Sequence, residues 1–404
     1  MNVSFYIAKR YLFAKKRRNA VNIISWISVI SVAIGSSALV IVLSAFNGLE
    51  QLVESLFESF DPDIRIEATQ GKVFDPSNIP FNEINKMEGI ADYTKVLEEI
   101  SGIRHQEQEV IATLKGVEAS FLETSKLSEK IVDGQAILTK DEHNYALIGY
   151  GLATELRLNT ATTAPILTLF SPKRKVISSI DPSQLVYSAK ISPSGIFYIS
   201  PEFDYTYCVL PLSFLQNMLD YQNQISAIEI KVKDEREIEK IAADLSVLLG
   251  ENFSVRNRYE FNELIYKTNK TEKWITFLIL IFILIIASFN ILSSLSMLII
   301  EKKKDLFTLK SLGLKQQSIK NIFFTEGLLI NLLGALVGIL FGVVICLLQK
   351  HLGIVPLEGG IVEYYPVEIE WLEIVYIAFT VIIIGLLTSW YPVRKLTAVD
   401  TTSV

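Results

Sequence analysis

The sequence predicts a membrane α-helical protein with four transmembrane helices and a large α+β extracytoplasmic domain inserted between the first and second helices. Half of its 404 residues are hydrophobic and its mean hydropathy is +0.36, which is too apolar for an ordinary soluble domain. The apolar residues are also concentrated in four long runs. One of the segments that separate these runs is long enough to fold around a core of its own.

Each of the four apolar runs reaches the roughly 20 residues that a helix needs to cross a bilayer. A cleaved signal peptide is disfavoured at the first run, which is too long and lacks a small-residue cleavage site after it. Before this run we expect an interfacial amphipathic helix, or else a disordered basic flank. The expected boundaries are the interfacial helix 1–20, transmembrane helices 21–47, 272–300, 322–349 and 371–392, the large inserted domain 48–271, the short helix and loop 301–321, the short loop 350–370 and the tail 393–404.

The distribution of lysine and arginine predicts the orientation, because these residues accumulate on the cytoplasmic side of a membrane. Residues 1–20 carry six basic residues and no acid, and residues 301–320 carry six lysines against two acids. The loop at 350–370 is acidic. These charges place both termini and the 301–320 loop in the cytoplasm and the 48–271 domain outside.

The inserted domain has the periodicities of mixed α and β structure. PDIRIEA and EQEVIATLKGV alternate like half-buried strands, and the region from ISAIEIKV to NFSVRNR predicts a strand, a helix and a second strand. Asp234 is the expected N-cap of that helix and Gly250 its stop.

No motif in the chain indicates catalysis, and we expect neither a catalytic residue nor a metal site. Phosphate-loop, G-x-S-x-G, H-E-x-x-H and C-x-x-C patterns do not occur, and the three histidines have no metal-ligand spacing. The net charge of −6 does not indicate nucleic-acid binding. Glu326 and Glu373 are placed near the ends of spans, so ion-coupled transport is disfavoured.

The segment EKKKDLFTLKSLGLKQQSIKNIFFTEG separates the second and third apolar runs. Its residues Leu306, Leu309 and Leu312 are three apart, so they share one face of a short helix that ends near Gly313. A short amphipathic helix between two spans is suited to docking in the groove of a partner protein. The alternative is that it lies flat on the lipid surface.

Three stretches carry a resemblance to a known family. ISWISVISVAIGSSALVIVLSAFNGLE resembles the first span of the lipoprotein-releasing permeases LolC and LolE, with the family's Asn-Gly step at Asn47-Gly48. The 301–327 segment resembles the coupling segment of the wider FtsX/MacB-type ABC permeases. WYPVRKLTAVDTTSV resembles the close of that family, although Thr401 stands where proline is usual.

The resemblance implies a permease subunit of an ATP-driven ABC transporter of the mechanotransmission kind. Such a chain is not itself an enzyme and binds no cofactor directly, since ATP with Mg is held by a separate LolD-like ATPase. The implied partners are a second permease chain, identical or a sister, membrane lipids, an acylated lipoprotein taken from the outer leaflet of the inner membrane, and a periplasmic carrier. The implied ATPase-coupling residues are Glu301, Lys302, Lys303, Lys304, Asp305, Leu306, Leu309, Lys310, Leu312 and Gly313.

Two further sets of residues follow from the same resemblance. Small residues in the first span allow either close helix packing or a side opening for acyl chains, and the residues that would line such an opening are Ser37, Val40, Leu43, Ser44 and Asn47. The loop SPKRKVISSIDPSQLVYS is either a plain surface loop or a contact for the periplasmic carrier, through Lys173, Arg174 and Lys175.

Two other functions fit the same span pattern. An FtsX-like regulator that activates a cell-wall hydrolase has four spans, but its external domain is typically smaller than the ~220 residues here. A MacB-like efflux permease usually carries its ATPase on the same chain, and this sequence has no phosphate loop.

Overall fold

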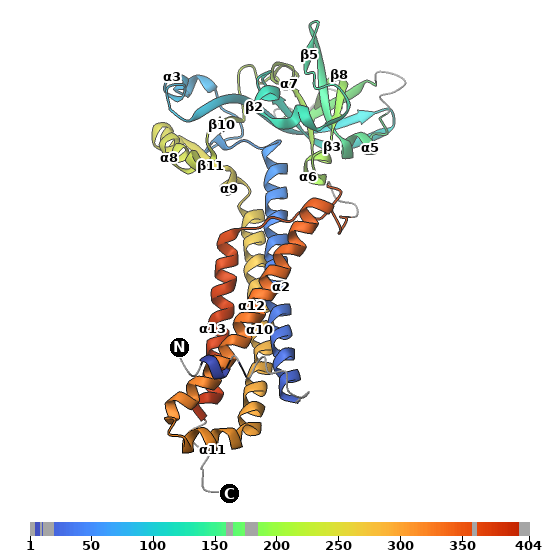
Figure 1. Ribbon diagram of the computed structural model, residues 1–404. Coiled ribbons are helices and arrows are strands. Elements are labelled where there is room, and N and C mark those ends of the chain that lie inside the picture. The colour runs from blue at the N-terminus through green and yellow to red at the C-terminus, as the bar shows by residue number, and fades with distance from the viewer. Residues whose placement is uncertain are drawn as a thin grey trace. The chain divides into compact units, whose positions relative to one another are not determined.

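The computed structural model describes residues 5–8, 10, 20–158, 165–173, 185–357 and 362–395. The chain divides into two compact units (Figure 1). A helical unit comprises Met1–Leu52 and Lys267–Val404, and a sheet unit comprises Val53–Tyr266. The sheet unit is therefore an insertion in the sequence of the helical unit.

Besides the helical residues 5–8 and 10, the described part of the helical unit contains four long helices and the shorter α11. Their bounds are α2 (Ala20–Glu58), α10 (Glu263–Glu301), α11 (Lys303–Ser311), α12 (Gln316–Leu352) and α13 (Trp371–Lys395). In the described residues, the four long helices have the length and apolar composition needed to cross a membrane. With the mixed sheet unit between the first and second of them, this arrangement confirms the predicted fold class.

Small residues hold α2 and α12 close together. Gly334, Gly338 and Gly342 repeat every four residues and therefore form one stripe along α12. A Cβ atom at Gly342 would lie 2.8 Å from Cβ of Val40, and one at Gly338 would collide with Ser36 of α2. The stripe lets the two backbones approach, which is how helices commonly associate where water supplies no hydrophobic driving force.

The sheet unit is organised around an 11-stranded sheet in the described part of the chain. The hydrogen-bonded order is β11-β1-β10-β2-β3-β9-β6-β8-β4, with β5 on β6 and β7 bridging β2 and β8. Most neighbours are antiparallel, but β3 with β9 and β6 with β8 are parallel. The strands are β1 (Ile64–Ala68), β2 (Ile90–His105), β3 (Gln108–Val117), β4 (Ile131–Gly134), β5 (Thr139–Lys140), β6 (His143–Gly149), β7 (Leu167–Pro172), β8 (Val186–Phe197), β9 (Tyr207–Pro211), β10 (Ala227–Val232) and β11 (Phe253–Asn257).

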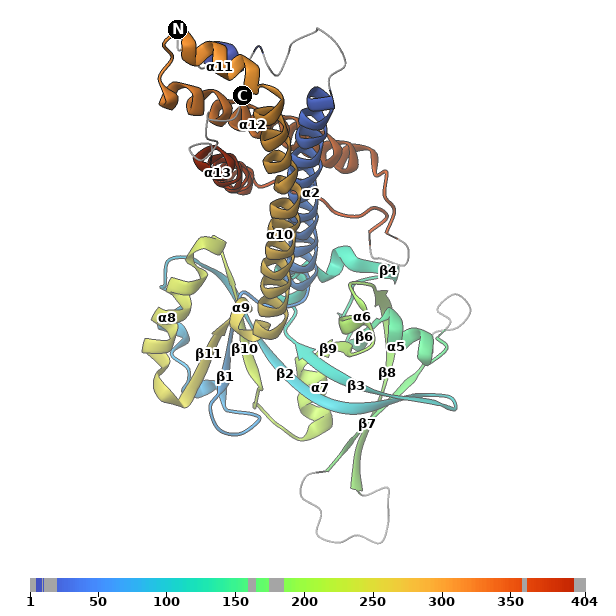
Figure 2. The same cartoon turned by 90° about the horizontal axis from the view of Figure 1, so that it is seen from below.

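Alternate residues of the strands form the core of this unit beneath its helices. Ile64, Leu97 and Ile228 are fully buried with the inner residues of α7 (Leu212–Leu219) and α8 (Ile238–Leu249), which lie over the sheet in Figure 2. The remaining short helices are α3 (Phe81–Ile84), α4 (Phe121–Thr124), α5 (Tyr150–Glu155), α6 (Pro201–Asp204) and α9 (Arg258–Phe261).

The predicted strand–helix–strand unit is present as β10, α8 and β11, with one difference at its start. Asp234 caps a separate 3₁₀ turn, Glu235–Glu237, by accepting from Arg236 N at 3.0 Å, and α8 begins after this turn. Gly250 ends the helix with φ of +66°, a conformation that favours glycine.

Candidate functional site

The 301–313 segment folds as a short helix between α10 and α12, at one end of the helical unit (Figure 1). Lys302 interrupts the helical backbone with ψ of +9°, so α11 begins at Lys303 and runs in a new direction. At the other end Gly313 has φ of +92°, which few residues other than glycine adopt without strain. These two positions set the length of α11.

The faces of α11 differ from those that leucine spacing predicts. Leu306 packs against a buried cluster that includes Phe323 of α12, and Leu309 is half-buried. Phe307, which the leucine pattern did not single out, is 64% exposed, and Leu312 is 76% exposed. Leu306 and Leu309 share the face of α11 that turns toward the rest of the helical unit, so helical geometry turns Phe307 outward.

The charged coupling residues lie mainly on the open side of this segment. Lys302 is half-buried, and the side chain of Lys304 lies outside the described residues. The exposed members of the predicted set are Glu301, Lys303, Asp305, Lys310, Leu312 and Gly313. Lys303 and Lys310 lie four residues before and three residues after Phe307, so they share its face of α11 and place charges beside the exposed ring, as at the polar rim of a protein interface.

The five residues expected to line an opening on the first span are all buried within this single chain. Ser37, Val40, Leu43, Ser44 and Asn47 are each at most 8% exposed. Val40 faces the glycine stripe of α12, and the Ser44 carbonyl accepts from Glu368 N at 2.9 Å. Here the small residues serve close packing, and an opening for acyl chains stays a prediction.

The Asn47-Gly48 step has a clear structural reason. Asn47 Nδ2 donates to Glu373 of α13 at 2.7 Å, and its Oδ1 accepts from Lys273 of α10. Lys273 and Glu373 also pair at 2.8 Å. A Cβ atom at Gly48 would collide with the backbone of Pro366, so only glycine lets this segment cross α2. One polar cluster therefore joins three of the four long helices.

In the sheet unit, the end of α2 is fastened to the start of the return segment. Arg258, 2% exposed, donates to Glu58 at 3.2 Å and also pairs with the fully buried Asp63. Asn262 Nδ2 donates to Asp61 Oδ2 at 2.9 Å. Because these residues lie about 200 positions apart in the chain, sequence periodicity could not have paired them. These contacts, called the clamp below, join the segment through which the chain enters the sheet unit to the segment through which it leaves.

A buried ionic network lies next to the clamp, on the polar side of β1, β2, β3 and β10. Lys115, 1% exposed, donates to Glu229 at 2.8 Å, and Arg65 donates to Glu229 at 3.1 Å and to Glu98 at 2.6 Å. Burial opposes ionisation of Glu98, but the charges of Arg65 and Lys115 outweigh it and hold the pKa of Glu98 below its usual value. The Lys115 ammonium also lies 4.5 Å from the ring centroid of Phe60, just after α2.

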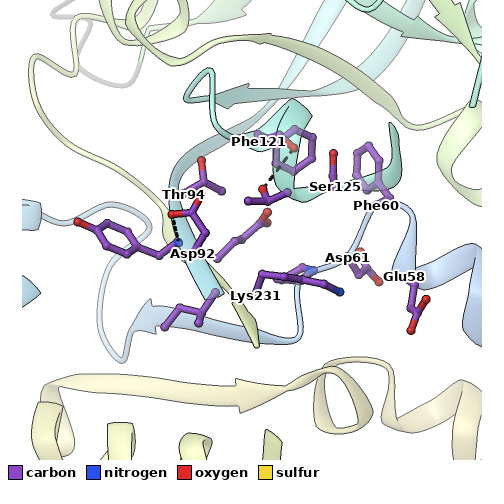
Figure 3. A pocket seen from close by; sticks show the side chains of 13 residues that line it. Glu58, Phe60, Asp61, Asp92, Thr94, Phe121, Ser125 and Lys231 are labelled. Carbon is purple, nitrogen blue, oxygen red and sulfur yellow. Dashed lines mark hydrogen bonds between the residues drawn. The ribbon is translucent and has the colours of Figure 1, made fainter. Parts of the chain in front are cut away.

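A small cavity opens beside this network (Figure 3). Its volume is about 30 Å³, enough for about one or two water molecules, and its lining includes Asp61, Asp92 and Thr94. The hydroxyl oxygens of Thr94 and Ser125 have no hydrogen-bond partner among the described residues. Burial raises the pKa of Asp61 to about 6, although Asn262 opposes this shift.

The predicted carrier-contact loop is only partly described. Lys173 follows β7, and its ammonium lies 5.3 Å from the ring centroid of Tyr187 on β8. Arg174 and Lys175 lie outside the described residues.

Comparison with known proteins matches both parts of the chain. The family model of the MacB-like periplasmic core domain matches residues 25–248, and that of the FtsX-like permease C-terminal region matches residues 277–400.

Individual relatives align over nearly the whole length. The chain is 24% identical to the lipoprotein-releasing system transmembrane protein LolE of Haemophilus influenzae, over 98% of this chain and 97% of that protein. It is 26% identical to the corresponding LolC of Buchnera aphidicola, over 97% and 95%. The crystal structure of the periplasmic region of MacB from Actinobacillus actinomycetemcomitans covers 54% of this chain and 98% of that chain at 13% identity, with a TM-score of 0.36.

Proposed function

Because the chain belongs to the family with a MacB-like periplasmic core domain and an FtsX-like permease C-terminal region, we propose that it is a permease subunit of an ATP-driven ABC transporter that releases lipoproteins. Its cargo would be acylated lipoproteins in the outer leaflet of the inner membrane, which it would transfer to a periplasmic carrier. The observation that carries this proposal is the alignment with LolE and LolC proteins over at least 95% of both chains.

The ATP-driven step requires a partner ATPase, which we place on α11. An exposed aromatic ring beside charged groups is the composition of a docking surface, and Phe307 with Lys303 and Lys310 supplies it. ATP and Mg would bind to that ATPase and not to this chain. A second permease chain, identical or a sister, would complete the transporter.

The proposed orientation follows from the lysine-rich loop. With α11 in the cytoplasm, the sheet unit lies in the periplasm and both termini lie in the cytoplasm. The protein is then a multi-pass inner-membrane protein, and the loop after β7 faces the compartment of the carrier. Lys173, with Arg174 and Lys175, is the proposed contact for that carrier.

The clamp and the Asn47 cluster support a mechanical mode of action. Motion that reaches α2 or α10 acts on residues joined through Arg258 and Glu58 in the sheet unit, and through Asn47, Lys273 and Glu373 in the helical unit. Displacement of either helix would therefore be resisted by part-buried polar bonds. This is the property that a mechanotransmitting permease needs.

Depletion of the protein, followed by fractionation of the membranes, tests the function. Lipoproteins should accumulate in the inner membrane, and re-expression of the wild-type chain should clear them. Normal lipoprotein sorting together with a division or lysis defect would instead support an FtsX-like regulator of a cell-wall hydrolase. Normal sorting with sensitivity to exported drugs or peptides would support a MacB-like efflux permease.

A further inference from the structure

The connection between α12 and α13 begins with a run of apolar side chains that the proposed function does not use. It lies at the end of α12 opposite α11 (Figure 1). The exposed apolar residues are Leu352, Ile354, Val355, Pro356 and Tyr364, and the three aliphatic ones are 54–66% exposed. We call these five residues the apolar tip. Exposed apolar side chains gathered in one place often mark a contact surface.

The backbone of this connection is held by the side chain of Gln349, in the last turn of α12. Gln349 is 7% exposed, its Nε2 donates to the carbonyls of Val355 and Tyr365, both at 3.0 Å, and its Oε1 accepts from Val355 N at 2.8 Å. Tyr365 N also donates to Val355 O at 3.0 Å, and Leu357 N donates to Glu363 O at 3.1 Å. A segment can enter the apolar part of a membrane interface only if its backbone groups are paired in this way.

Contacts with α2 place the connection level with the end of the spans. Glu368 N donates to the Ser44 carbonyl at 2.9 Å, and Pro366 passes so close to Gly48 that a Cβ atom there would collide with it. Ser44 and Gly48 lie at the end of the first predicted span. Trp371, the first residue of α13, is 73% exposed, and exposed tryptophans favour the membrane interface. The connection therefore lies where the hydrocarbon of a bilayer gives way to its headgroups.

The apolar tip continues an exposed stripe of α12. The stripe repeats every four residues, so its members share one helix face, and it comprises Leu336, Leu340, Val344, Leu348 and Leu352. Its first three members each follow a residue of the glycine stripe by two positions, which turns them about 200° around the helix and away from α2. The stripe is about 24 Å long, most of the thickness of the hydrocarbon. Lipid suits a face of this length and composition, and the tip extends the face beyond the end of the span.

We propose that the apolar tip inserts into the lipid interface of the leaflet opposite α11, with its aliphatic side chains among the upper acyl chains and the Tyr364 ring at the level of the headgroups. The partner of this surface is the lipid bilayer itself. Gln349 is the positioning residue, because it pairs backbone groups that the tip carries out of water. In the proposed orientation this leaflet is the outer one, which also holds the acylated cargo.

A nitroxide spin label on the tip measures the predicted insertion. Val355→Cys would be made in the full chain together with Cys208→Ala and Cys346→Ala, labelled, and placed in nanodiscs of phosphatidylethanolamine and phosphatidylglycerol. Collisions of the label with oxygen, which concentrates in lipid, and with a water-soluble nickel chelate report its surroundings. For a side chain about 5–10 Å into the interface, the ratio of oxygen to nickel collisions should be at least about fivefold that of a label in water.

Two matched labels set the scale of this measurement. Leu340→Cys, on the same stripe within the span, should give the ratio of a lipid-facing label, and Glu239→Cys, on the exposed face of α8, that of a label in water. A ratio at Val355 equal to that at Glu239 would overturn the proposal, because the tip would then lie in water. Slow collisions with both reagents would also overturn it, because protein, such as a second copy of the chain, would then cover the tip.

Gln349→Met tests the positioning role. Methionine preserves the length of the side chain but makes none of the hydrogen bonds to Val355 and Tyr365. The freed backbone groups should draw the tip toward water, so the collision ratio at Val355 should fall toward that at Glu239. An unchanged ratio would refute the role of Gln349. Gln316→Met, an exposed glutamine at the other end of α12, is the matched control.

These outcomes are independent of the proposed function. The nanodiscs contain neither an ATPase nor a lipoprotein, so normal lipoprotein sorting after depletion would refute the transport function and leave the lipid contact in place. A tip that lies in water would refute the lipid contact and leave the transport function in place.

Discussion

Replacing Phe307 with alanine tests whether α11 docks on a protein. The ring is 64% exposed, while the neighbouring Leu306 is packed inside the helical unit. A phenylalanine side chain offers about 200 Å² of surface, so about 130 Å² is left for a partner to cover. At about 25 cal/mol per Å² this area is worth ~3 kcal/mol. Phe307→Ala should therefore weaken ATPase binding by up to about 100-fold.

The assay is a titration of the detergent-purified permease with the isolated ATPase subunit. Ser311→Ala is the control, because Ser311 is an exposed polar residue of the same helix and its loss removes little apolar surface. Membrane fractionation of both variants shows that insertion is intact. The docking argument is refuted if Phe307→Ala binds the ATPase with unchanged affinity.

Three further predictions concern contacts within the helical unit or within the sheet unit. Gly48→Leu should abolish stable folding of the helical unit or displace the 366–367 backbone, because the added side chain collides with it. Tryptophan fluorescence should then report a lower melting temperature. An unchanged melting temperature would contradict the close crossing at Gly48. Arg258→Met should destabilise the sheet unit by about 3 kcal/mol, because it leaves the buried Asp63 with fewer partners, and hydrogen exchange of residues 53–266 should report it. The pKa of Asp61 is raised from 3.8 to about 6 in the folded state, so between these pH values the folded protein keeps the Asp61 proton that the unfolded chain has lost. The free energy of unfolding should therefore fall as pH rises from about 4 to 6, by no more than about 3 kcal/mol. Asp61→Asn should remove that slope, and a slope equal to the wild type would assign it to other groups.

Much of the architecture was predictable because it depends on local sequence properties. A helix that crosses a membrane must be long and apolar along its own length, so the four spans can be recognised one at a time. The short helix at 301–313 was also predictable, since its end needs a residue such as Gly313 that tolerates positive φ. The strand–helix–strand unit around α8 carried clear periodicities.

The candidate site was only partly predictable for the opposite reason. Periodicity shows that Leu306 and Leu309 share a face, but only packing against Phe323 shows that this face turns inward and leaves Phe307 exposed. The Asn-Gly step was visible in the sequence, whereas its cause, the crossing of Pro366 over Gly48, was not.

Contiguous residues specify the four apolar spans and the family, and the lysine-rich loops predict an orientation, because each of these features can be recognised within a single stretch of the chain. Only the tertiary structure decided which distant groups meet. It paired Arg258 with Glu58 and Asp63, placed Lys115 beside Glu229, and buried Glu326 where its carboxylate has no hydrogen-bond partner in the described part of the chain. The free energy of a buried charge depends on the neighbours that folding brings to it, and those neighbours come from elsewhere in the chain.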